Sequence, residues 1–209
     1  MKKSKVLLTL MCAVALVVTS VFGTLAYLQD TDEVKNTFTV GNVQIKLDEK
    51  DITKTDGTRT EEGNKYHLLP GHVYDKDPTV TVLKGSESSY IKMTVTFSNA
   101  KELDAIFAPT GANLTSIFGG YDAANWIAKG NTEDTQKNTR TYEFWYKETV
   151  AAPEGNVELD ALFDTITVPG TINNDQLKTI AGMTITVNAY AIQADGFANA
   201  EAAWAAAKF

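Results

Sequence analysis

The two histidines of the chain are the side chains that come closest to a catalytic or metal-binding pattern. His67 and His72 flank Pro70-Gly71, with four residues between them. The zinc motif H-E-x-x-H needs two histidines on one helical face and a glutamate as general base. Here no glutamate separates the histidines, and Pro70 interrupts a helix. We therefore predict two solvent-facing loop histidines, with no catalytic residue, no metal site and no cofactor.

The hydroxyl and carboxylate side chains do not form a recognisable active site either. A hydrolytic triad needs a Ser, Cys or Thr beside a histidine that an acid orients, and the chain has no G-x-S-x-G motif. Calcium loops space their acids as D-x-D-x-D-G, which neither acidic cluster does. These clusters are Asp48, Glu49 and Asp51, and Asp75 and Asp77. We expect solvated surface charges, and we expect no enzyme.

A stripe of aromatic residues is compatible with two interpretations. Tyr142, Phe144 and Tyr146 share one face of an alternating segment, and Trp145 lies on the opposite face. Such a stripe resembles a carbohydrate-binding platform. However, a period of two is typical of a strand with one buried face, and large apolar side chains are mostly buried. We predict that this stripe belongs to the core of a sheet.

Alternating patterns also define the elements that position these side chains. The clearest strand has Ile91, Met93, Val95 and Phe97 on one face. An earlier strand changes phase at Gly41-Asn42, which predicts a bulge. Other strands are expected at 36–47, 79–83, 141–150, 165–168 and 183–193, helical segments at 101–107, 157–163, 173–180 and 198–209, and loops at 48–65 and 108–137.

Short strands bounded by turn residues, with few helices between them, predict the fold class. We expect an all-β protein: a jelly-roll-like antiparallel β-sandwich with a few short helices and a C-terminal helix. Residues 27–209 are enough for one domain of this kind. The C-terminal helix is expected to pack on the sheet through an apolar stripe formed by Phe197, Ala200, Trp204 and Ala207.

The amino terminus, residues 1–26, has the three-part plan of a secretory signal peptide. Three lysines precede an uncharged run over 6–18, and small residues follow. Small side chains at the −3 and −1 positions predict cleavage between Ala26 and Tyr27. The alternative is an uncleaved anchor, because 6–26 has about the 20 residues that span a bilayer. Only through that uncleaved segment do we expect contact with a membrane.

Charge and cysteine content describe the expected mature chain. Removing the signal removes three lysines, so Lys+Arg falls from 19 to 16 against 26 Asp+Glu, and the net charge becomes 16 − 26 = −10. This excess of negative charge argues against nucleic acid or an anionic membrane surface as a partner. The single cysteine, Cys12, lies in the signal, so the mature protein is predicted to lack disulfides and thiol ligands.

The junction of signal and mature chain resembles the TasA/camelysin family of exported Gram-positive proteins. The stretch GTLAYLQDTDEVKNTFTVGNVQIKLDE covers residues 23–49. It is similar to the family's G-T-x-A before cleavage, its aromatic residue and Asp after cleavage, and its T-F-x-x-G strand. The segments at 68–82 and 162–197 add to the resemblance. The matching signature residues are Gly23, Thr24, Ala26, Tyr27, Asp30, Thr37, Phe38 and Gly41.

The resemblance implies a role outside the cell. Family members are processed by a SipW-type signal peptidase and fold as jelly rolls, and TasA-like members polymerise into fibres of the biofilm matrix. In those fibres the extended amino terminus of one subunit completes the sheet of the next. Carried over to this chain, the donor segment is 27–35. Its apolar anchors are Tyr27, Leu28 and Val34, and Asp30 is the family's acidic position.

We therefore expect a secreted structural protein, a fibre subunit of the extracellular matrix or cell surface whose main partner is another copy of itself. A donated strand pairs the exposed backbone of a sheet edge, and a head-to-tail contact that does not close propagates as a filament. Because 29–33 is polar, the segment could instead be a frayed terminus. The competing functions are a camelysin-like surface metallopeptidase, for which no zinc motif is present, and a non-polymerising adhesin or accessory protein.

Overall fold

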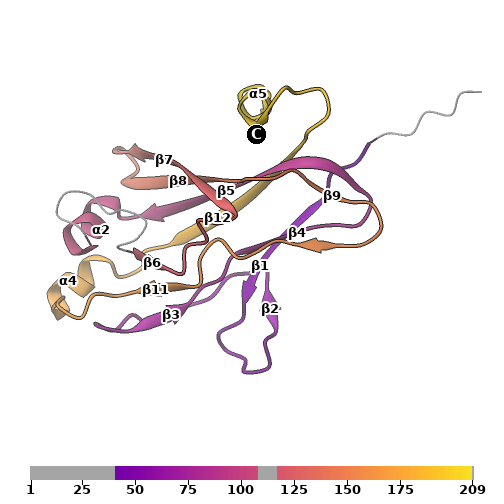
Figure 1. Cartoon of the computed structure of the whole chain (residues 1–209). Helices are drawn as coiled ribbons and strands as arrows, with labels where there is room; N and C mark the ends of the chain where they lie inside the picture. The colour runs from indigo at the N-terminus through magenta and orange to yellow at the C-terminus, as the bar shows by residue number, and fades with distance from the viewer. Residues whose placement is uncertain (1–40, 108–116, 209) are drawn as a thin grey trace, which may run out of the picture. The chain divides into compact units, whose positions relative to one another are not determined.

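The longest strand, β5 (Ser86–Ser98), is central to one layer of the structure (Figure 1). The structure is a computed structural model and describes residues 41–107 and 117–208. The inward-facing apolar residues of β5 are fully buried. β12 pairs with one side of β5, β8 and the short β9 pair with the other, and β7 pairs with β8. The bounds are β7 Trp126–Asp134, β8 Thr139–Tyr146, β9 Val150–Ala152 and β12 Ile185–Gln193.

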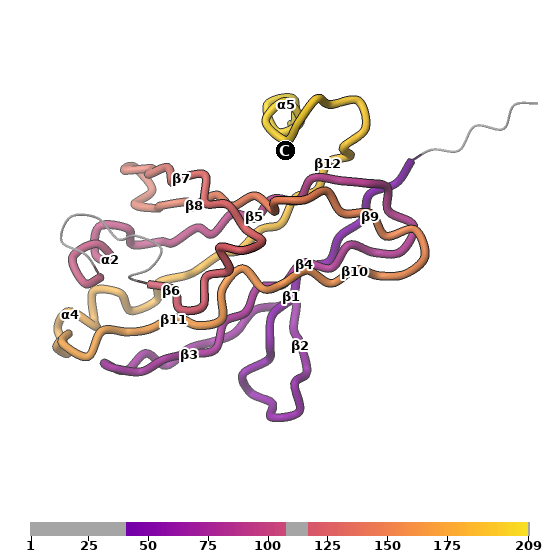
Figure 2. The backbone as a smooth tube through the Cα atoms, in the orientation of Figure 1, coloured from indigo at the N-terminus to yellow at the C-terminus, as the bar shows by residue number. Residues whose placement is uncertain are grey.

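Short strands in two small sheets form the opposite layer (Figures 1 and 2). Their orders are β10-β4-β1-β2 and β3-β11-β6. The chain passes from β3 to β4 through residues 76–78, so the two small sheets are linked along one layer. The bounds are β1 Ile45–Lys50, β2 Arg59–Thr60, β3 Val73–Asp75, β4 Thr79–Val82, β6 Phe118–Gly119, β10 Val157–Glu158 and β11 Thr165–Thr167.

The chain crosses repeatedly between the two layers. It passes from β4 to β5, from β6 to β7, from β9 to β10 and from β11 to β12, and every strand pair is antiparallel. Figure 2 follows this winding along the backbone. The predicted fold, an all-β jelly-roll-like antiparallel sandwich with a few short helices and a C-terminal helix, is confirmed.

Aromatic side chains join the two layers in the core. Phe118 of β6 lies between Phe97 of β5 and Phe163, with ring centroids 5.5 and 3.8 Å away. Burying one such ring stabilises the fold by about 1.5–3 kcal/mol. Tyr142 and Phe144 are 5 % and 0 % exposed. The aromatic stripe of β8 is therefore core, as predicted, rather than an exposed platform.

Three short helices are present in the described residues: α2 Ala100–Phe107, α4 Asn174–Thr179 and α5 Ala200–Ala206. Asn173 begins α4 with a capping box, because its side chain accepts from two backbone N–H groups and Gln176 returns a bond to its own N–H. α5 lies on the outer face of the five-stranded sheet (Figure 1). There the ring of Trp204 lies 6.2 Å from that of Trp145 in β8.

Several predicted boundaries are wrong. β1 begins at Ile45 and runs on to Lys50, so the predicted loop at 48–65 starts inside a strand and also contains β2. The predicted loop at 108–137 contains β7, most of whose side chains are exposed. An exposed edge strand has no buried face, so its sequence shows no alternation. Residues 157–158 form β10 rather than a helical turn.

Several sequence predictions lie outside the described residues. These are the signal peptide at 1–26, its cleavage between Ala26 and Tyr27, and the donor segment at 27–35. Within residues 41–107 and 117–208, none of the helices has the length and apolar character needed to cross a bilayer.

Candidate functional site

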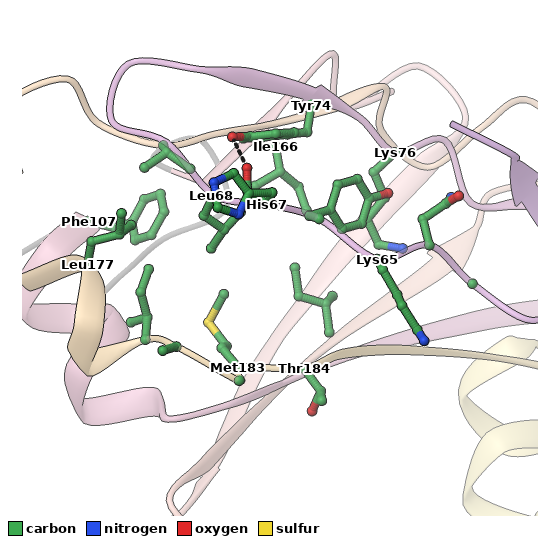
Figure 3. A pocket seen from close by; sticks show the side chains of 18 of the residues that line it. Lys65, His67, Leu68, Tyr74, Lys76, Phe107, Ile166, Leu177, Met183 and Thr184 are labelled. Carbon is green, nitrogen blue, oxygen red and sulfur yellow. Dashed lines mark hydrogen bonds between the residues drawn. The ribbon is translucent and has the colours of Figure 1, made fainter. Parts of the chain in front are cut away.

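A cleft of about 850 Å³ opens between the two layers beside the start of β12 (Figure 3). One wall comes from β3, β11 and the segment 62–68, and the other from residues 183–185. Figure 3 places Tyr74 and Ile166 across the opening from Met183 and Thr184. Residues of α2 and α4 close one end. The cleft therefore marks a margin where the two sheets do not meet.

Most of the cleft wall is apolar. Leu68, Phe107, Ile166, Leu177 and Met183 line it, and each comes from a different part of the chain. Burying such apolar surface contributes about 25 cal/mol per Å². The cleft is therefore suited to an apolar or amphipathic partner rather than to a charged one.

The other end of the cleft is polar and tightly organised. Lys76 donates a hydrogen bond to Oε2 of Glu49, and both residues are buried. Asn64 donates from Nδ2 to Oε1 of Glu49 at 3.0 Å and to the Lys50 carbonyl at 2.8 Å. Its Oδ1 accepts from the Ile52 N–H at 3.0 Å. Every polar atom of the Asn64 amide therefore has a partner.

Tyr66 lies beside this polar end, and Tyr74 packs against Tyr66. Their ring centroids are 5.8 Å apart in an edge-to-face arrangement. The Tyr66 hydroxyl donates to the Asp75 carbonyl at 3.0 Å. Burial raises the pKa of this hydroxyl, and the negative charge of Glu49 adds to the rise. The neutral phenol is thus the stable form beside the ion pair.

A second group of charges involves Asp48, the neighbour of Glu49 in β1. The Arg59 guanidinium donates to Asp48 through Nε and to Oδ2 of Asp77 at 2.8 Å through Nη1. Burial alone raises the pKa of Asp48. Hydrogen bonds from Arg59 and Lys46 outweigh this effect and hold that pKa below its ordinary value. Asp48 therefore stays ionised although it is buried.

The prediction that the acidic clusters are solvated is wrong for Asp48 and Glu49. They are only 7 % and 5 % exposed, because β1 continues through both positions and each acid meets a cation from another segment. Asp75, by contrast, is exposed. The sequence shows the acids, but it does not show that Arg59 and Lys76 fold back onto them.

β12 is an edge strand with little protection. It pairs with β5 over all nine of its residues, and the described strands offer it no partner on the other side. Its sequence, ITVNAYAIQ, has no charge, proline or glycine. In natural proteins, such residues or a bulge usually prevent an edge strand from pairing with another chain. β12 therefore presents a pairing surface next to the cleft.

The opposite edge of the same sheet is different. β7 carries Lys129, Glu133 and Asp134, and its register with β8 shifts between Ala128 and Gly130. Charges and a bulge both discourage pairing with another chain. Of the two edges of the five-stranded sheet, β12 is the one suited to accept a strand.

The inner face of β12 is incompletely covered. Ile185, Val187, Ala189 and Ala191 contact the core but are only partly buried, whereas the inward residues of the neighbouring β5 are fully buried. β1, in the other layer, approaches β12 without pairing to it. Apolar surface thus remains along the margin where these two strands face each other.

The two histidines are exposed, as predicted. His67 lines the cleft and its carbonyl accepts from the Tyr74 hydroxyl at 2.7 Å (Figure 3). His72 stacks against the same tyrosine ring at 6.3 Å. Both histidines thus lie against Tyr74. Within the two described ranges, the structure brings no three His, Cys, Asp or Glu side chains together as a metal site.

The Pro70-Gly71 turn between the histidines rests on a second Pro-Gly sequence, Pro169-Gly170. Gly71 has φ +75°, which favours glycine, and a Cβ at this position would lie 3.5 Å from the Cα of Gly170. The Gly71 N–H donates to the Val168 carbonyl at 3.0 Å, and the Val168 N–H donates to the His72 carbonyl at 2.9 Å. The paired turns hold the cleft wall formed by β3 and β11.

Fold and site together define a class of protein: an antiparallel β-sandwich with an unprotected edge strand beside a largely apolar cleft. No protein-family model matches the chain, and no curated protein or solved structure was found to be similar to it.

The sequence did not predict that Asn64 and Lys76 belong to this site, nor that the strand expected at 183–193, β12, has an open edge. The absence of charge from residues 185–193 is visible in the sequence and could have marked an open edge. The cluster of Asn64, Lys76 and Glu49 joins residues far apart in the chain, so no local spacing reveals it. Only the fold brings these three side chains together.

Proposed function

We propose that this chain is a secreted structural protein, a TasA-like fibre subunit of the extracellular matrix or cell surface. The observation that carries the proposal is the edge of β12, nine residues without charge, proline or glycine and without a described partner. An edge of this kind is a template for another strand. The protein's partner in this proposal is a second copy of itself.

The proposed occupant of the edge is the segment 27–35 of a neighbouring subunit. Cleavage after Ala26 makes this segment the free amino terminus, and its nine residues equal the length of β12. Backbone hydrogen bonds supply most of the attraction in such strand addition, and alternate side chains enter pockets. Tyr27, Leu28 and Val34 are the side chains suited to the apolar surface along β12.

The contact between the segment and β12 is heterologous, because the two surfaces are different. Each subunit then donates one segment and accepts another, so the assembly continues as a filament unless rotation closes it into a ring. The expected mature charge of −10 keeps free subunits soluble before assembly. This arrangement gives the signal-peptide cut a second role, since it releases the donor segment.

Deleting residues 27–35 from the exported chain tests the proposal. We expect the intact mature protein, with Tyr27 as its first residue by mass spectrometry, to form fibres visible by electron microscopy. The deletion variant is expected to stay monomeric by light scattering. A triple variant, Tyr27→Ser with Leu28→Ser and Val34→Ser, keeps the segment length and removes its anchors. Fibres from the deletion variant, or none from the intact chain, would refute the proposal.

A further inference from the structure

The polar end of the cleft brings an amine, an amide and a carboxylate together inside the protein. Lys76 and Glu49 are 6 % and 5 % exposed. Lysine and glutamate are rarely buried, and removing such a pair from water carries a desolvation cost that a surface pair avoids. The Asn64 side chain contacts the same carboxylate. The cluster therefore combines a nucleophile, an acyl group and a proton carrier.

The two oxygens of Glu49 hold the two nitrogens. Oε2 accepts from Lys76 Nζ, and Oε1 accepts from Asn64 Nδ2 at 3.0 Å. The acyl oxygen of Asn64, Oδ1, accepts from the Ile52 N–H at 3.0 Å. A backbone N–H at this position stabilises negative charge that develops on an amide oxygen during nucleophilic attack. The attacking and the leaving nitrogen thus contact the two oxygens of one carboxylate, and a backbone N–H contacts the acyl oxygen.

We propose that Lys76 and Asn64 form an intramolecular isopeptide bond, with Glu49 as the proton carrier. Glu49 takes a proton from the Lys76 ammonium, and the freed lone pair of Nζ attacks Cγ of Asn64. The C=O electrons move onto Oδ1, where the Ile52 N–H donates. The carbonyl then re-forms, and the bond from Cγ to Nδ2 breaks.

The atoms and charges balance without a further reactant. Two protons leave Nζ through Glu49 and join the departing nitrogen, which leaves as ammonium with the positive charge that Lys76 carried. Glu49 ends as a carboxylate, and a Cγ–Nζ amide replaces the Cγ–Nδ2 amide. No oxidant or reductant is consumed. Glu49 holds both nitrogens within one molecule, and this arrangement supplies the rate advantage of an intramolecular reaction.

The surroundings favour the product over the ion pair. Tyr66 lies beside the cluster and packs against Tyr74, and burial makes a charged lysine costly. The bond ties residue 64, after β2, to residue 76, between β3 and β4. It therefore fixes the segment 62–68 that forms one wall of the cleft. This inference does not depend on fibre formation, because the cross-link forms within one subunit.

Mass spectrometry of the purified full chain tests the proposal. We expect an intact mass lower than the sequence mass by one ammonia, about 17 Da. After trypsin digestion, the peptides containing Asn64 and Lys76 should be found joined, with no cleavage after Lys76. An intact mass equal to the sequence mass, with both peptides separate, would overturn the proposal.

Variants distinguish the isopeptide bond from other losses of ammonia. Lys76→Arg keeps the charge but removes the amine nucleophile, so the loss should disappear. Glu49→Gln should abolish the linkage or slow it at least tenfold in a time course after refolding. Lys178→Arg, at an exposed lysine in α4, is the matched control and should keep the loss. If Asn64 instead cyclises on its own backbone, the loss persists in Lys76→Arg and the peptides stay separate, which would also overturn the proposal.

Discussion

Four charged side chains are buried in the described residues, and each meets the opposite charge. They are Asp48, Glu49, Lys76 and Arg140. Arg140 binds Asp104 through both terminal nitrogens and also reaches Glu133 at 3.1 Å. The hydrogen bond with Asp104 raises the pKa of Arg140, so it stays charged. Removing one partner of such a pair leaves a buried charge uncompensated, which is more costly than losing a surface ion pair.

Asp48→Asn should destabilise the protein by about 1–3 kcal/mol at pH 7, because the Arg59 guanidinium loses a charged acceptor. The folded-state pKa of Asp48 lies below its unfolded value. Its stabilisation is therefore fully present above about pH 4 and is lost as pH falls through the folded pKa. Urea unfolding at pH 7 and pH 3 measures this difference.

Asp195→Asn, at an exposed loop position, is the matched control and should change stability by less than about 0.5 kcal/mol. In acid, the gap between the wild type and Asp48→Asn should narrow. Equal stability of the two proteins at pH 7, or a gap that stays constant at pH 3, would contradict this explanation of the Arg59 cluster.

For single residues, the sequence could predict burial where a local pattern determines which side chains face inward. The inward residues of β5 and the stripe of Tyr142 and Phe144 are buried as expected, because period two alone determines the face of a strand. The burial of Glu49 and Lys76 could not be predicted. Their burial depends on a contact between β1 and residues 76–78, which are far from β1 in the sequence. Charged residues are normally expected to be exposed.

Among the elements, the two edges of the five-stranded sheet differ most in their suitability for pairing with another chain. Strands β7 and β12 lie at opposite ends of the order β12-β5-β8-β7. β7 has charges and a bulge, whereas β12 has neither over nine residues. The difference indicates that aggregation is prevented at one edge while pairing remains possible at the other.

A lysine placed on each edge in turn tests this difference. Asn188→Lys in β12 should raise the critical concentration for fibre assembly about tenfold, which corresponds to about 1.4 kcal/mol per contact. Asn131→Lys, the same change at an exposed position of β7, should leave it within about twofold. Both asparagines are exposed, so neither change disturbs the core. Equal effects at both edges would contradict a role for β12, and pelleting across a concentration series supplies the measurement.

Helices and strands with a strong hydrophobic periodicity or a clear helix-capping residue could be predicted from the sequence. Exposed or very short strands could not. The helix expected at 173–180 is α4, which Asn173 caps, and the strand expected at 183–193 is β12. β7 was missed because it is almost wholly exposed and is held mainly by pairing with β8. β10 has only two residues, too few for a periodic signal.

At the scale of the whole molecule, the proposed assembly joins a free amino terminus to an open sheet edge on another subunit. The mature chain is expected to contain no cysteine, since Cys12 lies in the proposed signal peptide. Cysteines introduced in pairs can therefore report a single contact. A disulfide needs the two Cα atoms within about 7 Å, so it forms only where the strands lie side by side.

The most direct measurement mixes two mature single-cysteine variants, Asp30→Cys in the donor segment and Asn188→Cys in β12, under mild oxidation. Strand donation predicts a disulfide-linked dimer of the two chains, and a ladder of linked oligomers when one chain carries both substitutions. Asn131→Cys in β7 replaces Asn188→Cys as the control and should give no linked product with Asp30→Cys. No linkage between Asp30→Cys and Asn188→Cys, or a bond formed only within one chain, would contradict the donation of residues 27–35 to β12 of a neighbouring subunit.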